Sequence, residues 1–204
     1  MENFINKSDL INCQKRIAPY IHRTPVLTSR ILNKLSGADL YFKCENFQRI
    51  GAFKMRGAAN AVLLLSDEQK RKGVVTHSSG NFAQALALSA QNIGVKSYIV
   101  MPSNASQVKK DAVKEYGGEI IECEPTLIAR ESAAKLIVDN KGAVFIHPYD
   151  NLNVIIGQAT ACIELLEEQP DLDAVFAPIG GGGLITGTAL AAHFFGKNCK
   201  TFGG

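Results

Sequence analysis

One lysine of the sequence stands where its amine could act as a nucleophile. Lys54 follows Gly51 and Ala52 and precedes a run with helical spacing, so we expect it at the start of a helix. Its neighbours Phe53 and Met55 are apolar. Because desolvation and the positive end of a helix both lower the pKa of an amine, this setting favours the neutral form that attacks carbonyl carbons. On spacing alone, a surface lysine with a buried stem is the more common arrangement.

A polar turn offers groups that could bind an anion. Ser78, Ser79, Gly80 and Asn81 follow an expected strand at residues 74–77 and precede a helix. The carboxyl ends of parallel strands are where open α/β sheets bind ligands. Hydroxyls, an amide and the free N–H groups of a helix start suit an anionic group. A Ser/Asn cap on the helix explains the same residues equally well.

A second turn consists of four consecutive glycines between a strand and a helix, namely Gly180, Gly181, Gly182 and Gly183. It is not a Walker loop, because no Gly-Lys-Ser/Thr follows, and Ile185 stands where a dinucleotide-binding motif would have its third glycine. A structural turn needs fewer glycines than this. A run of glycines allows backbone N–H groups to close around a phosphate at a helix start, so we predict a phosphate-binding loop.

Together these three segments predict a cofactor. A lysine amine, an anion-binding turn and a phosphate loop, all expected at strand ends, fit a phosphorylated carbonyl compound. Pyridoxal 5'-phosphate, bound to Lys54 as a Schiff base, satisfies all three. We predict no metal ligands in this chain, because its histidines are too widely spaced for a zinc motif. These histidines are His22, His77, His147 and His193.

The elements that must position these residues alternate along the chain. Apolar or β-branched runs predict strands at residues 40–43, 74–77, 97–101, 119–123, 144–147 and 174–178. Helical spacing predicts helices at residues 55–65, 82–91, 106–116, 127–138 and 153–168, with one more after the glycine turn. Strands that alternate with helices imply crossover connections, and near-continuous apolar runs imply strands covered on both faces. The sequence therefore predicts an α/β fold with parallel strands.

Composition excludes several classes of protein. Hydrophobic residues make up 46% and charged residues 20% of the 204 residues, as in globular proteins. The net charge of +3 is not gathered on one basic face, so we predict no nucleic-acid partner. The charge-free stretch 174–196 contains Pro178 and the glycine turn, so we predict no membrane span. Widely spaced cysteines and a start, Met1 to Lys7, without an apolar signal segment predict a cytoplasmic protein.

Three motifs in a fixed order carry a resemblance to a known family. They are GAFKMRGA around Lys54, SSGN at residues 78–81 and GGGGL at residues 180–184. In these motifs the chain resembles the fold-type II pyridoxal-phosphate enzymes, and within them the serine/threonine dehydratase and serine racemase branch. The likeness extends to HRTPVLTS at residues 22–29 and IIGQATACIELLEE at residues 155–168.

The resemblance implies a three-layer αβα architecture with two lobes. A large cofactor-binding lobe would comprise residues 1–72 and 150–204, and a small lobe residues 73–149. Members of the family are longer than this chain, so the C-terminal part of the large lobe would be missing. The residue that meets the pyridine nitrogen, and the ligands of a divalent cation known in the family, would lie beyond residue 204.

The resemblance also implies roles for individual residues. Lys54 would hold the cofactor and remove the substrate Cα proton, and Ser79 would exchange a proton on the opposite face. Phe53 would border the pyridine ring, and Asn81 would donate a hydrogen bond to its phenolic oxygen. The groups implied to cradle the phosphate are Gly180, Gly181, Gly182, Gly183 and Leu184. The residues implied to contact the substrate are Ser78, Ser79, Gly80, Asn81 and Arg130.

The implied activity is that of an ammonia-lyase that eliminates water from L-serine or L-threonine to give a 2-oxo acid and ammonia. One alternative is a serine racemase that uses Lys54 and Ser79 as its two bases. Phe82, where the family usually has histidine, favours the dehydratase, as do Arg30 and Ile50, which replace hydroxyl residues of an activating nucleotide site. A truncated cofactor-binding fragment without turnover is an alternative of another class. The implied partners are a small hydroxy-amino acid and, for the full-length protein, a second copy in a homodimer.

Overall fold

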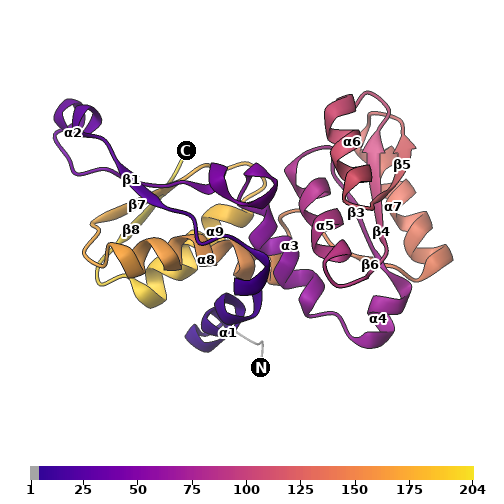
Figure 1. Cartoon of the computed structure of the whole chain (residues 1–204), viewed down its shortest axis with the longest axis horizontal. Helices are drawn as coiled ribbons and strands as arrows, with labels where there is room; N and C mark the ends of the chain where they lie inside the picture. The colour runs from indigo at the N-terminus through magenta and orange to yellow at the C-terminus, as the bar shows by residue number, and fades with distance from the viewer. Residues whose placement is uncertain (1–4) are drawn as a thin grey trace.

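The structure, a computed structural model, describes residues 5–204 (Figure 1). Residues 1–4, which hold part of the segment for which we expect no secretory signal, lie outside that description. The α-helices are α1 (Lys7–Ile17), α2 (Arg30–Ser36), α3 (Lys54–Leu63), α4 (Asp67–Lys72), α5 (Asn81–Gln91), α6 (Gln107–Glu115), α7 (Leu127–Lys141), α8 (Leu152–Glu168) and α9 (Gly183–Phe195). The strands are β1 (Val26–Thr28), β2 (Tyr41–Lys43), β3 (Val74–His77), β4 (Ser97–Pro102), β5 (Glu119–Cys123), β6 (Val144–Phe145), β7 (Ala174–Ala177) and β8 (Lys200–Gly203). None of these helices is long and apolar enough to cross a membrane.

Parallel strands form the sheet at one end of the molecule, in the order β5, β4, β3, β6 (Figure 1). Strands β3 and β4 are buried along their whole length. Val74 and Ile99 share a core with α5. Val75 and Val100 pack with Ala134 of α7 on the opposite face. Both faces therefore need apolar side chains, which explains the continuous apolar runs. The predicted α/β class with parallel strands is confirmed.

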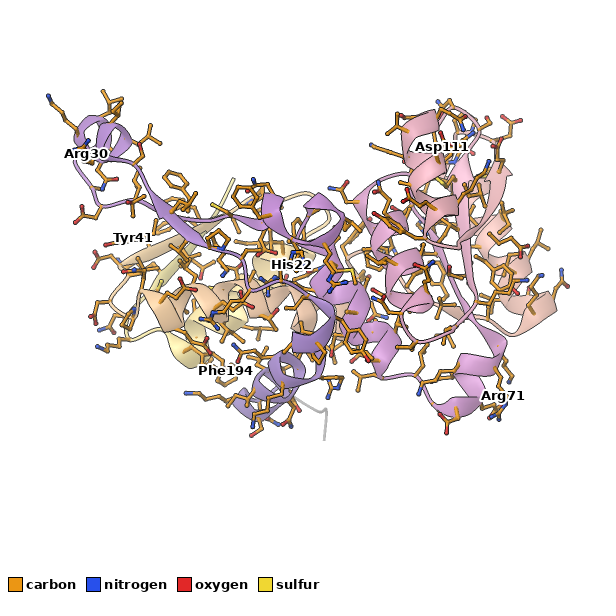
Figure 2. The ribbon with its side chains drawn as sticks, viewed as in Figure 1. His22, Arg30, Tyr41, Arg71, Asp111 and Phe194 are labelled. Atoms are coloured by element: carbon orange, nitrogen blue, oxygen red, sulfur yellow. The ribbon has the colours of Figure 1, made fainter. Side chains whose placement is uncertain are left out.

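The other end of the molecule is built around α8, which shares a core with α1, α3 and α9. Strands β7 and β8 pair in parallel beside these helices. Strands β1 and β2 pair antiparallel and form, with α2, an arm that projects from the body (Figure 1). Arg30 lies on α2 at the end of this arm (Figure 2). The strand expected at residues 40–43 therefore belongs to an antiparallel ribbon, and the two-lobe boundaries at 73 and 149 stay a prediction.

Several elements differ from the sequence-based expectation for local reasons. The sequence-based expectation leaves out α1, α2 and α4. Helix α1 does have helical apolar spacing, since Leu10, Cys13 and Ile17 are buried on one face, and the N-terminal ends of all these helices carry side-chain caps. Asn6 and Ser66 each form a capping box, at α1 and α4, and the Ser29 hydroxyl accepts a hydrogen bond at the start of α2. The strand expected at residues 144–147 ends at Phe145, because the next residues form a tight turn.

The β7–β8 sheet is covered on one face only. Val175 is buried against the helices, whereas Phe176 is 76% exposed. The Phe176 ring stacks on that of Phe202, with centroids 5.2 Å apart. Within residues 5–204, helices cover one side of this sheet, on which Val175 is buried.

Two glycines allow α3 and α8 to approach closely. A Cβ atom on Gly157 of α8 would lie 2.5 Å from the Cα of Gly57 and 2.6 Å from the carbonyl oxygen of Arg56, both on α3. Backbone atoms cannot yield as a flexible side chain would, so only glycine fits at this crossing. Because α3 begins with Lys54, the crossing also fixes the helix that carries the candidate nucleophile.

We predict that Gly157→Ala lowers the free energy of unfolding by about 1–3 kcal/mol, because the helices must separate to admit the methyl group. Urea unfolding followed by circular dichroism measures this change. Gly180→Ala is the matched control, since a Cβ at that position meets no atom within 4 Å. Equal unfolding midpoints for the two variants would contradict the prediction.

Candidate active site

Lys54 is the first residue of α3, and its side chain is half-buried. Its Nζ donates a hydrogen bond to the carbonyl oxygen of Pro148 at 2.9 Å. The amine also lies 5.2 Å from the ring centroid of Phe53 and 5.8 Å from that of Phe82. Burial lowers the pKa of Lys54, and the position at a helix start acts in the same direction. The structure thus places this amine in apolar surroundings instead of on an open surface.

The chain enters α3 through a strained turn. Ile50 has a φ of 60°, a conformation that β-branched residues rarely adopt, and Gly51 follows with a φ of 70°. The Ile50 side chain packs against both large hydrophobic cores. This packing holds the turn that leads into Lys54, and such strain is common beside functional groups.

The polar turn at residues 78–81 lies between β3 and α5. The Ser78 N–H donates to the carbonyl oxygen of Val100 at 3.1 Å, which anchors the turn to the end of the sheet. Gly80 occupies the N-cap position of α5, and no side chain accepts a hydrogen bond there. The simple Ser/Asn helix cap is therefore not formed. Ser78, Ser79 and Gly80 are half-buried and Asn81 is exposed, so the turn keeps polar groups available for a ligand.

The glycine loop at residues 180–183 connects β7 to α9. Gly182 has a φ of 87°, which favours glycine, and no side chain caps the start of α9. A Cβ on Gly181 would overlap the ring of Tyr149, and one on Gly183 would lie 2.9 Å from the Tyr149 carbonyl oxygen. At Gly180 a Cβ would meet open space. Free N–H groups, a helix start and a narrow backbone cradle fit the phosphate of pyridoxal phosphate.

The segment from His147 to Asp150 joins these parts, and its role is not evident from the sequence pattern. The Pro148 carbonyl oxygen meets Lys54, while Tyr149 packs against Gly181. From the sequence alone, His147 is expected to end a strand, and it is one of four widely spaced histidines. Its position after a strand of a parallel sheet is the signal that could have drawn attention to it.

His77 and His147 lie together although they are far apart in sequence. Their ring centroids are 5.6 Å apart. Burial lowers the pKa of both imidazoles, and the Lys54 charge lowers the pKa of His147 further. For His147, the charges of Asp150 and Glu131 oppose this lowering. A lowered pKa favours the neutral form of each ring. They line a surface pocket of about 360 Å³ between β6 and α7.

Arg130 is the candidate residue carried by α7, on the face of the sheet opposite α5. Its Nε donates to the Thr126 carbonyl oxygen of the same helix at 3.3 Å. The pKa of His77 is lowered most by burial, then by His147 and then by the positive charge of Arg130. The structure thus groups Lys54 with Phe53, Phe82 and the Pro148–Tyr149 segment, and places Arg130 where its charge acts on His77.

Relatives of known name match nearly the whole chain. Serine racemase of Dictyostelium discoideum is 48% identical over 198 residues, which make up 97% of this chain and 61% of that protein. L-threo-3-hydroxyaspartate ammonia-lyase of Saccharomyces cerevisiae is 51% identical over 195 residues, 96% of this chain and 60% of that protein. The crystal structure of T.th. threonine deaminase has a TM-score of 0.90 at 41% identity, with 98% of this chain and 64% of that chain covered. The chain thus spans about 60% of the length of the curated relatives it matches.

A family-wide sequence pattern also matches the chain. The family is described as pyridoxal-phosphate dependent enzyme, and the match covers residues 17–203. This stretch includes Lys54, the polar turn and the glycine loop. The family match and the identities to the relatives agree with the cofactor expected from the lysine, the polar turn and the glycine cradle. The chain belongs to the family of pyridoxal-phosphate-dependent enzymes.

Proposed function

We propose that the chain carries the active site of a pyridoxal-phosphate-dependent serine/threonine dehydratase, which converts L-serine or L-threonine into a 2-oxo acid and ammonia. The observation that carries the proposal is the half-buried Lys54 amine, held by Pro148 and lying beside Phe82 at the start of α5. The names of two relatives, an ammonia-lyase and a threonine deaminase, support elimination.

Each part of the site has a task in this reaction. When bound, pyridoxal phosphate supplies an electron sink for negative charge at the substrate Cα. The N–H groups of Gly180–Gly183 and Leu184 bind the phosphate at the start of α9. Phe53 would border the pyridine ring of the cofactor, and Asn81 would donate a hydrogen bond to its phenolic oxygen. Lys54 would hold the cofactor and would take the Cα proton, and its lowered pKa suits a general base. The residues proposed to orient the substrate carboxylate are Ser78, Gly80 and Arg130.

Phe82 favours elimination over racemisation. The residue is buried, and its ring lies 5.8 Å from Lys54 Nζ, so it brings an apolar surface to this side of the site. Racemisation needs a group that returns a proton to Cα from the face opposite Lys54, and an apolar Phe82 leaves that task to Ser79. Serine racemase remains the second candidate, because a relative of that name is 48% identical.

The test is product analysis with the chain loaded with pyridoxal phosphate. We expect pyruvate from L-serine and 2-oxobutyrate from L-threonine in a coupled dehydrogenase assay, with less D-serine on chiral chromatography. An excess of D-serine would favour the racemase. Retained cofactor without any product would favour a non-catalytic fragment, an alternative supported by the coverage of about 60% of the relatives' length. A chain that retains no cofactor would contradict the proposal.

The proposal extends to the setting of the enzyme. The substrate is a small hydroxy-amino acid, without a nucleic-acid or membrane partner. We propose a cytoplasmic homodimer for the full-length protein.

A further inference from the structure

One short segment connects the four-stranded sheet to the helices around α8. The Ile146 N–H donates to the Val75 carbonyl oxygen at 2.9 Å, the last backbone hydrogen bond on the sheet side. The Asn151 side chain accepts from the Val154 N–H at 3.1 Å and starts α8. The residues between these anchors, 147–150, form the crossover.

The crossover is folded around one imidazole ring. His147 Nδ1 accepts a hydrogen bond from the Asp150 N–H at 2.9 Å and a longer one from the Tyr149 N–H at 3.4 Å. An imidazole nitrogen accepts hydrogen bonds only when it carries no proton, so this turn requires neutral His147 with its proton on Nε2. Protonation would replace the acceptor with a donor that faces two N–H groups.

The same turn sets two contacts of the active site. Its Pro148 carbonyl oxygen accepts the hydrogen bond from Lys54 at 2.9 Å. Its Tyr149 ring covers Gly181, and its Tyr149 backbone lies against Gly183. Any change in the turn therefore moves the partner of the lysine and the wall of the glycine loop together.

We propose that His147 is a positioning residue, which in its neutral form holds the crossover so that Pro148 meets Lys54 and Tyr149 supports the glycine loop. The naming of these groups as an active site rests on the proposed function, whereas the turn itself does not depend on it. His147 acts through Pro148 and Tyr149 and has no direct part in the reaction.

The surroundings of His147 allow its proton to exchange with solvent. The ring lines the surface pocket of about 360 Å³ between β6 and α7. The titratable groups around it are Lys54 on α3, His77 on β3, Glu131 on α7, and Tyr149 and Asp150 on its own turn. The charge of Arg130 on α7 acts on the neighbouring His77. Burial lowers the pKa of His147; Asp150 and Glu131 oppose this effect, and Lys54 adds to it. Lys135 and Asp139, also on the pocket wall, pair with each other at 2.7 Å.

Two variants separate positioning from simple packing. His147→Asn keeps an acceptor near the Nδ1 position but cannot take a proton, whereas His147→Phe keeps a ring without an acceptor. All measurements use the 204-residue chain without cofactor. Amide exchange by NMR reports protection of the Asp150 N–H, and competitive acetylation with mass spectrometry reports the reactivity of Lys54 relative to Lys197, which is 72% exposed and lies away from the His147 pocket.

In the wild-type chain we expect protection of the Asp150 N–H to fall about fivefold as the pH drops below the pKa of His147. His147→Asn should keep, at every pH, both the protection and the relative Lys54 reactivity that the wild-type chain shows above the pKa of His147. His147→Phe should lose the protection at every pH and change the relative acetylation of Lys54 several-fold from the wild-type value. If His147→Phe does not fold, the wild-type pH series against His147→Asn decides the question.

Two results would overturn the proposal. The first is wild-type protection that is independent of pH and equal to that of His147→Asn. The second is loss of protection without any change in Lys54 reactivity. Because no cofactor or substrate is used, absence of product from hydroxy-amino acids would count against the proposed function alone.

Discussion

Lys54→Arg is expected to lower the rate of 2-oxo acid formation by at least about a thousandfold, because arginine keeps the charge but cannot form the bond to the cofactor. The guanidinium can still donate to the Pro148 carbonyl oxygen, so we expect the free energy of unfolding to change by less than about 1 kcal/mol. Borohydride reduction followed by peptide mass spectrometry measures the attachment directly. The wild-type chain should carry a pyridoxyl group on the Lys54 peptide, and the variant none.

Lys135→Arg is the matched control for this experiment. Lys135 lies on α7, is 73% exposed and pairs with Asp139. The variant should retain both activity and the pyridoxyl group on the Lys54 peptide. A pyridoxyl group that remains in Lys54→Arg, attached to another lysine, would show that Lys54 is not the attachment point.

Arg56→Met is expected to lower the free energy of unfolding by about 3–5 kcal/mol. Arg56 has no solvent exposure. Its guanidinium makes two hydrogen bonds of 2.8 Å to Glu45 and two of 2.8 Å to Glu164. Lys43 lies 2.7 Å from Glu164 and contributes a second positive charge. Methionine would fill the space of the side chain but leave the buried carboxylates short of one cation, and urea unfolding measures the loss.

Two further variants test whether charge causes this loss. Lys135→Met removes an exposed ion pair and should change the free energy of unfolding by less than about 0.5 kcal/mol. Adding Glu164→Gln to Arg56→Met should recover part of the loss, because one buried carboxylate no longer needs a partner. A loss below about 1 kcal/mol in Arg56→Met would contradict this account of the buried charges.

The pattern of the sequence predicts the local parts of the site well, because each depends on a short stretch of chain. Lys54 lies at a helix start because the helical spacing begins there, and the glycine loop follows β7 directly. The α/β class follows from the alternation of elements. A strand that pairs antiparallel in an arm, such as β2, has the same local signature as one in a parallel sheet, so its pairing could not be predicted.

The contacts that complete the site are not predictable in this way, because they join distant residues. Pro148 lies 94 positions from Lys54, and Glu164 lies 108 positions from Arg56. Neither contact can be detected from the spacing or periodicity of residues in the sequence. The role of His147 could not be predicted either. A histidine that accepts hydrogen bonds within a turn and a histidine that merely ends a strand look the same in the sequence.

The stacked phenylalanines of the β7–β8 sheet have a practical consequence for every experiment above. Phe176 and Phe202 form an exposed aromatic surface. Beside it, β8 pairs with β7 alone among the described strands, so its other edge is open. Such surfaces drive reversible self-association at high protein concentration. If only the folded chain self-associates, the measured free energy of unfolding depends on the protein concentration. Unfolding midpoints of the variants are therefore comparable only at one chain concentration.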